Sequence, residues 1–87
     1  MIHRATHSFW AKYEQLDNVT RKLADKNFEL LKLAPQHPSF HFKKLSGDLW
    51  SIRVGIVYRA LALPRKEGFD WFWIGPHHEY DQPINQR

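Results

Sequence analysis

The first half of the chain places apolar residues at the spacing of helices. Phe9, Tyr13 and Leu16 fall on one face of a short helix, and Thr6 or Ser8 can cap its start. An apolar face of this kind has to be buried against another element. The N-terminal segment is therefore predicted to pack on a neighbouring layer of structure.

A second, longer helix is predicted over residues 19–34, because Asp17-Asn18 interrupts the first pattern and offers a new N-cap. Its apolar face comprises Leu23, Ala24, Phe28, Leu31 and Ala34. Pro35 ends the helix, since proline cannot continue the backbone hydrogen bonding. Two helices joined by so few residues are expected to form a roughly antiparallel hairpin. Residues 2–4, ahead of them, are predicted as a short leading strand.

The second half alternates apolar and polar residues with the period of strands. The strands are predicted over residues 40–43, 50–54, 57–63 and 69–74. Turn-forming residues separate them at Ser46-Gly47-Asp48, at Gly55 and over residues 64–68. Short connections favour an antiparallel meander with the helices over one face. The predicted fold class is therefore α+β, a helical hairpin packed on one face of an antiparallel sheet.

The last predicted strand is apolar on both faces, which is typical of a central strand. Simple alternation places Trp71 and Trp73 on one face, with Phe72 and Ile74 on the other. Aromatic side chains on an open sheet face can stack on nucleobases, but on a buried strand they more often form core. We expect these residues to be core.

The length of 87 residues fits a single domain spanning residues 1–87. The absence of cysteine excludes disulfides, thiolate nucleophiles and sulfur-ligated zinc sites. No apolar run approaches the roughly 20 residues of a membrane span, and the start of the chain lacks the apolar stretch of a signal peptide. A cytoplasmic location without membrane association is the expectation.

The net charge of +4 is unevenly distributed. The segment 40–66 has six basic residues against one acid, a net +5, while the remainder is slightly acidic. The basic residues are Lys43, Lys44, Arg53, Arg59, Arg65 and Lys66. Such a segment favours an anionic partner, either nucleic acid or an acidic protein. The alternative is that these side chains only solvate exposed strand positions.

Two of these cations are predicted to share the sheet face away from the helices. Alternation places Arg53 opposite Ile52 and Val54, and Arg59 belongs to the neighbouring strand. Adjacent guanidinium groups repel each other unless an anion lies between them, and their planar fork suits phosphate oxygens. The alternative is that each arginine pairs with a nearby acid such as Asp48 or Asp70.

The segment after the last strand concentrates side chains that can transfer protons. It comprises His77, His78, Glu79, Tyr80 and Asp81. Histidine titrates near neutral pH, a carboxylate can orient its ring, and a tyrosine can bind phosphate or stack on a base. A metal site is a second interpretation, although adjacent histidines seldom reach one ion and no HExxH spacing is present. A third is a polar turn without chemistry.

Four pieces of the sequence, in this order, resemble the RelE/ParE superfamily, the small toxins of bacterial toxin–antitoxin pairs. They are FKKL, LWSIRVG, VYRAL and WFWIGPHHEY, and the last looks like the ending of the YafQ branch. The resemblance covers nearly the whole chain. It implies a four- to five-stranded antiparallel sheet with the helices on one face. It also implies a basic face that receives mRNA in the ribosome, and a cognate antitoxin protein as partner.

In the ribonuclease members a ribose 2′-hydroxyl attacks the adjacent phosphorus, which needs a base, an acid and cations but no metal or cofactor. By resemblance, His77 is the catalytic histidine, Arg59 a phosphate clamp, and Arg53 a basic position on the preceding strand. Tyr80 lies near a functional aromatic position of the family and is counted with these residues as catalytic. The resemblance also assigns phosphate-binding roles to Lys43, Lys44 and His78, and an orienting role to Glu79. The implied function is an mRNA endoribonuclease that inhibits translation.

One departure from the family pattern keeps alternatives open. Ser51 stands where several ribonuclease members have a lysine. Members of the ParE branch share the fold, lack most catalytic groups and act on DNA gyrase. A non-nuclease toxin, or an inactive member that only binds its antitoxin, is therefore the alternative.

Overall fold

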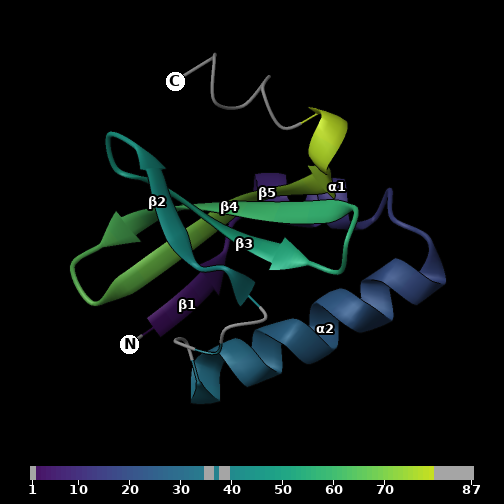
Figure 1. Ribbon diagram of the computed structural model, residues 1–87, viewed down its shortest axis with the longest axis horizontal. Helices are drawn as coiled ribbons and strands as arrows, with labels where there is room; N and C mark the ends of the chain where they lie inside the picture. Colours follow the sequence, from purple (N-terminus) through teal and green to yellow (C-terminus); the bar gives the residue numbers. More distant parts are fainter. Residues whose placement is uncertain (1, 35–36, 38–39, 80–87) are drawn as a thin grey trace.

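A computed structural model describes residues 2–34, 37 and 40–79. The elements in chain order are β1 (Ile2–Ala5), α1 (His7–Tyr13), α2 (Asn18–Leu33), β2 (Lys43–Ser46), β3 (Leu49–Val54), β4 (Tyr58–Arg65), β5 (Gly68–Pro76) and the 3₁₀ turn η2 (His77–Glu79). Figure 1 shows α2 on one side of the sheet, while β5 leads into η2 on the other. The predicted α+β class, with two helices on a five-stranded sheet, is confirmed.

Both predicted helix starts are confirmed by their caps. The Thr6 hydroxyl accepts a hydrogen bond from the Phe9 amide at 3.3 Å, and the Asp17 carboxylate accepts one from the Thr20 amide at 3.2 Å. Hydrogen bonding to the Thr20 side chain, supported by this bond from the Thr20 amide, lowers the pKa of Asp17. These caps satisfy backbone donors that a helix leaves unpaired at its first turn.

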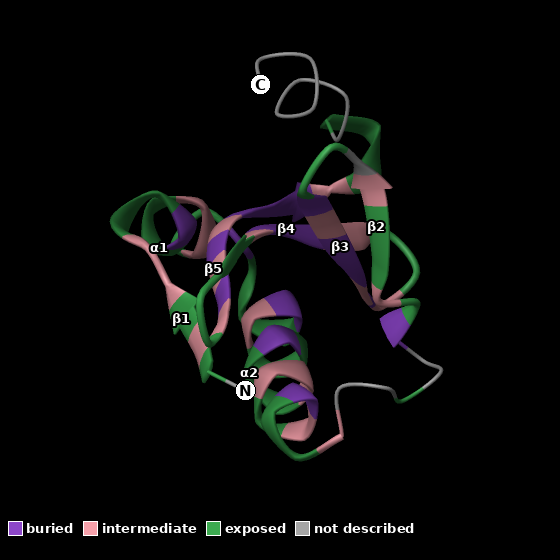
Figure 2. Ribbon diagram, turned by 90° about the vertical axis from the view of Figure 1, so that its left-hand side faces the viewer, coloured by how far each residue is buried: buried purple, intermediate pink, exposed green. Residues whose placement is uncertain are grey.

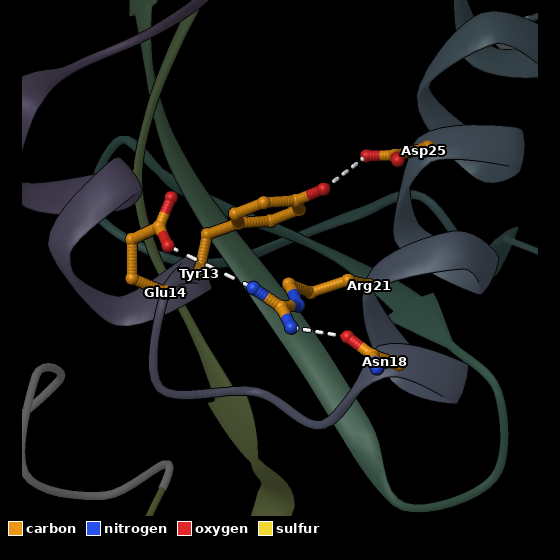
Figure 3. Close-up of polar contacts among 5 residues, drawn as sticks. All are labelled: Tyr13, Glu14, Asn18, Arg21 and Asp25. Carbon is orange, nitrogen blue, oxygen red and sulfur yellow. Dashed lines mark hydrogen bonds and ion pairs between the residues drawn. The ribbon is translucent and has the colours of Figure 1, made fainter.

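Side-chain contacts tie the two helices together (Figure 3). The Tyr13 hydroxyl donates to the Asp25 carboxylate at 2.7 Å, a bond that raises the pKa of Tyr13. Arg21 pairs with Glu14 at 3.7 Å and also donates to Asn18. All these groups lie at the junction of α1 and α2, so they fix how the helices meet.

The apolar face of α2 differs from the prediction at Leu23. That side chain is 37% exposed, whereas Thr20, Ala24 and Leu31 are buried. The buried face therefore follows positions 20, 24 and 31, with Phe28 packed against them. Thr20 was missed because its methyl group packs as an apolar surface despite the hydroxyl.

The sheet has the strand order β1-β5-β4-β3-β2. The antiparallel meander of β2 to β5 is confirmed, but the sheet is mixed because β1 pairs with β5 in parallel. The expectation of a wholly antiparallel sheet was wrong. Both helices separate β1 from the rest of the sheet in sequence, and such a long connection lets a strand return in parallel.

The strand predicted at residues 40–43 begins later. Phe40 lies in a 3₁₀ turn, His41 has a positive φ of 45°, and β2 starts at Lys43. Phe40 is buried and Phe42 packs against the same core. The alternation at Phe40 and Phe42 therefore reflects a loop that inserts both rings into the core, and not a strand.

Two apolar clusters lie on the two faces of the sheet. The helix-side cluster joins Phe9, Leu16, Ala24, Leu31 and Phe40 to Ile52, Val54, Ala60, Ala62, Phe69, Trp71 and Ile74. The second cluster comprises Leu49, Leu61 and Trp73, with Leu45, Leu63 and Phe72 packed against it. Figure 2 shows the buried residues in purple along β3, β4 and β5. The face carrying the second cluster is called the open face below.

The prediction that Trp71 and Trp73 share a face was wrong. The pairing of β4 with β5 shifts register between Leu61 and Ala62. A bulge of this kind inserts one residue and reverses the alternation beyond it. Trp71 and Ile74 therefore point to the helices, while Phe72 and Trp73 belong to the open face.

Candidate functional site

Arg53 and Arg59 are directly opposed in the antiparallel register of β3 and β4. Directly opposed residues on neighbouring strands point to the same face. The flanking residues Ile52, Val54 and Ala60 pack in the helix-side cluster, so both arginines lie on the open face. This arrangement agrees with the sequence prediction.

In the part of the chain that the structure describes, no ion pair neutralises the two arginines. Arg59 Nη1 donates to the carbonyl oxygens of Tyr58 at 2.9 Å and Ile56 at 3.5 Å. Arg53 Nε is buried and has no hydrogen-bond partner within residues 2–34, 37 and 40–79. Among the described residues neither arginine forms an ion pair, and Asp70 pairs instead with Arg65. Two adjacent cations without an acid form a site suited to an anion.

The histidine segment lies close to this arginine pair. In the register of β4 and β5, Arg59 opposes Gly75 and Tyr58 opposes Pro76. The His77 amide then donates to the Val57 carbonyl at 2.6 Å, which anchors η2 to the β3–β4 turn. The side chains of His77, His78 and Glu79 are all exposed. A histidine thus follows the end of β5 beside two cations.

The chain does not stay extended beyond Pro76. Residues 77–79 form a 3₁₀ turn, so His77 and His78 do not point in opposite directions as they would on a strand. Glu79 pairs with His78 at 3.8 Å when that histidine is protonated. Tyr80 and Asp81 lie outside the described residues.

Gly75, which pairs with Arg59, has no room for a side chain. A Cβ at this position would lie 2.8 Å from Cζ2 of the Trp73 indole. The indole therefore covers the Gly75 backbone on the open face. Any larger residue would push the ring away from its place in the second cluster.

The two lysines of β2 point in different directions. Lys43 pairs in register with Ser51, an open-face residue, whereas Lys44 pairs with Trp50 of the helix side. Both side chains are exposed. Lys43 is therefore the lysine that shares a face with Arg53.

Ser51 is almost fully buried, with 2% of its surface exposed. It lies on the open face opposite Leu61, at the border of the second apolar cluster. A charged lysine at this position would be desolvated by its neighbours. The local packing is therefore that of a core position, which explains why a small residue is present.

The metal interpretation gains no support from the geometry. Within the described part of the chain, no group of three or more His, Asp or Glu side chains is arranged to hold an ion. Nor does any helix there have the length and apolar content needed to cross a membrane.

A cavity of about 340 Å³, which the sequence did not indicate, lies at the outer edge of β3. It is lined by Leu23 and Asn27 of α2 together with His41, Arg53 and Gly55, so Arg53 borders α2 at the edge of β3 as well as the open face. Its location depends on the left-handed backbone at His41 and on the approach of α2 to β3. Neither feature has a signal in the hydrophobic pattern.

No family model matches the chain, and no curated protein matches it in sequence. Solved structures do match. A chain of the RelB–RelE antitoxin–toxin complex from Methanococcus jannaschii has a TM-score of 0.74 at 13% identity, covering 93% of this chain and 98% of that one. The YoeB/ParE toxin from Agrobacterium tumefaciens has a TM-score of 0.68 at 20% identity, covering 88% and 99%.

The isolated E. coli RelE toxin matches with a TM-score of 0.65 at 15% identity, covering 98% of this chain and 96% of that one. Each match spans most of this chain and nearly all of the chain to which it is compared. They do not distinguish the YafQ branch, which stays a prediction. The resemblance inferred from the sequence motifs is confirmed at the level of architecture: the chain has the fold of the RelE and YoeB/ParE toxins.

Proposed function

We propose that this protein is the toxin of a toxin–antitoxin pair and a metal-independent mRNA endoribonuclease of the RelE/ParE superfamily, active on the ribosome. One observation carries the proposal. Arg53 and Arg59 face each other on the open face without a carboxylate among the described residues, beside the strand end that leads to His77.

The proposed chemistry follows from these groups. A ribose 2′-oxygen attacks the adjacent phosphorus, the bond to the 5′-oxygen breaks, and a cyclic phosphate forms. The 2′-hydroxyl loses a proton as it attacks, and the departing 5′-oxygen gains one. His77 carries out one of these two transfers and water the other, while Arg59 and Arg53 stabilise the charge on the pentacoordinate phosphate. Lys43, which pairs with Ser51 and so shares a face with Arg53, is proposed to bind a neighbouring phosphate. Tyr80, Lys44 and His78 are proposed to contact the RNA, with Glu79 orienting His78.

The proposal of an antitoxin partner is supported by solved structures that share the fold. Those from M. jannaschii, E. coli and Pyrococcus horikoshii are complexes of RelE with RelB. A localised charge of +5 over residues 40–66 would attract an acidic segment of such a partner.

The burial of Ser51 favours the two alternatives to a nuclease. Because the position assigned to a lysine in several ribonuclease members is here a 2%-exposed serine, the chain lacks that candidate base. A toxin acting on DNA gyrase, or an inactive protein that only binds an antitoxin, would need no such group.

The experiment that separates these functions compares two products in cells after brief induction. A nuclease yields transcripts cut at defined positions, with a 2′,3′-cyclic phosphate on the upstream fragment. A gyrase poison yields broken chromosomal DNA with intact transcripts. An inactive protein yields neither, and each of the last two outcomes would overturn the nuclease proposal.

A further inference from the structure

A second group of cations lies at the other end of the open face. Arg4, Arg65 and Lys66 line a cavity of about 460 Å³ together with Glu67 and Asp70. The site is six residues along β4 from Arg59, which corresponds to about 20 Å of strand. It is therefore separate from the arginine pair described above, and the sequence analysis assigned it no chemistry.

Register and alternation place this group on the open face. Arg4 pairs with Asp70 in the parallel register of β1 and β5, so the two side chains share a face. Phe69 and Trp71, on either side of Asp70, pack in the helix-side cluster. Asp70 and Arg4 therefore point away from the helices.

Arg65 reaches the same face along β4. From Arg59 onward, alternate residues of β4 are Leu61, Leu63 and Arg65, and the two leucines belong to the second cluster. Since side chains at i and i+2 lie on one side of a strand, Arg65 follows them. The open face thus has cations at both ends and apolar side chains between.

Asp70 holds Arg65 in a defined orientation. Its Oδ2 accepts a hydrogen bond from Arg65 Nε at 2.6 Å. The Asp70 side chain is only 17% exposed, while that of Arg65 is 64% exposed. Among the described residues the Nη groups of Arg65 have no other partner. A half-buried carboxylate on Nε leaves the outer fork of the guanidinium directed at solvent, a geometry that suits two phosphate oxygens.

The side chains that line the cavity include both cations and acids, with one cation in excess. Asp70 is engaged by Arg65, which leaves Arg4 and Lys66 as cations and Glu67 as the remaining acid. Between this cavity and the arginine pair, Phe72 and Leu63 are half-buried members of the second cluster. Apolar and aromatic surface between two cationic ends is the arrangement of a single-strand binding groove.

We propose that Arg65, oriented by Asp70 and assisted by Arg4, binds a second backbone phosphate of the RNA strand whose scissile phosphate lies at Arg53 and Arg59. This inference rests on the proposed function and extends it by defining the path of the RNA along β4. The second site anchors the strand and takes no part in the chemistry.

The test is a binding titration with fully 2′-O-methylated RNA, which cannot undergo cleavage. The parent protein, Arg65→Ala, Arg65→Lys and Arg59→Ala are each titrated with a trinucleotide and a decanucleotide at several salt concentrations. Lys22→Ala, which removes one exposed cation from α2, is the matched control. A trinucleotide is too short to reach both ends of the face, whereas a decanucleotide reaches both.

We expect Arg65→Ala to weaken decanucleotide binding about 10-fold and to lower the slope of log Kd against log salt by about 0.7, the value for one phosphate of a single strand. Trinucleotide binding should be unchanged in Arg65→Ala but weakened in Arg59→Ala. Arg65→Lys should restore the salt slope but only part of the affinity, because lysine cannot present the same fork.

Two results would overturn the inference and leave the proposed function intact. In the first, Arg65→Ala binds the decanucleotide like the Lys22→Ala control while Arg59→Ala is impaired. In the second, Arg65→Ala loses affinity for an acidic antitoxin segment and not for RNA. If the parent protein binds neither the trinucleotide nor the decanucleotide, and cuts no transcript in cells, the proposed function fails as well.

Discussion

Arg53 and Arg59 lie directly opposite each other across β3 and β4, and neither forms an ion pair among the described residues. Such a pair is electrostatically unfavourable in isolation and is stabilised by a bound anion. The register of β3 and β4 alone brings the two arginines together, so the fold itself produces the cationic site that the proposed chemistry needs.

Arg59→Ala is expected to reduce RNA cleavage by about 10²–10³-fold, since it removes a cation that stabilises charge in the transition state. The defect should be the same between about pH 5.5 and pH 8, because a guanidinium stays protonated throughout. Cleavage rates across this range test it, with Lys22→Ala as the control. A defect that disappears at low pH would indicate proton transfer by Arg59 or a neighbour instead.

Ser51→Lys is expected to destabilise the protein and not to create a nuclease base. The position is 2% exposed and borders apolar residues, so an introduced ammonium would lower the free energy of unfolding by roughly 2–4 kcal/mol. Chemical denaturation measures this change. Arg53→Lys, two residues along the same strand and half-buried, is the control that should fold normally. A stable Ser51→Lys protein with faster cleavage would contradict the packing argument.

His3 is expected to make the stability of the fold depend on pH. Trp71 Nε1 donates to His3 Nδ1 at 3.0 Å, which requires the neutral ring, and burial together with the charge of Lys32 lowers the pKa of His3. The unfolded chain, with a pKa near 6.5, therefore takes up a proton before the folded chain does. Stability is highest above pH 6.5 and falls as the pH drops below it.

Denaturation midpoints at pH 8 and pH 5 test this linkage. His3→Gln keeps an acceptor for Trp71 but cannot titrate, so its midpoint should change less with pH than that of the parent. His7→Gln alters an exposed histidine and should keep the parental dependence. Equal pH dependence in the parent and His3→Gln would exclude His3 as the responsible group.

Binding of the antitoxin is expected to weaken with rising salt. The segment 40–66 carries a net +5, and Lys43, Lys44, Lys66 and Arg65 are exposed, so an acidic partner segment gains from long-range attraction that ions screen. Calorimetry between low and high salt tests this. Affinity independent of salt would show that apolar docking dominates the interface.

The sequence predicted those parts of the fold that depend on local pattern. The caps at Thr6 and Asp17, the turn glycines Gly47 and Gly55, and the face of Arg53 all follow from spacing and residue type. Each needs only a few neighbouring residues to be specified, so periodicity was sufficient.

Features that depend on distant contacts were not predicted. The parallel pairing of β1 and the bulge that separates Trp71 from Trp73 arise from how strands meet across the sheet. The same is true of the pair formed by Arg65 and Asp70, and of the 3₁₀ turn at His77, which is anchored by the Val57 carbonyl. Hydrophobic alternation along one strand contains no information about these partners.

The most direct test of the account is transcript-end mapping after brief induction of the parent, His77→Ala and His78→Ala proteins at equal levels. Both histidines are exposed neighbours in one turn, so the two substitutions should perturb the fold alike. A single proton-transfer group contributes about 10²–10⁴-fold to a rate. We therefore expect cut transcripts with the parent and with His78→Ala, and a loss of that size with His77→Ala. Equal cutting by His77→Ala and the parent, or growth arrest by the parent without any cut transcript, would contradict the account.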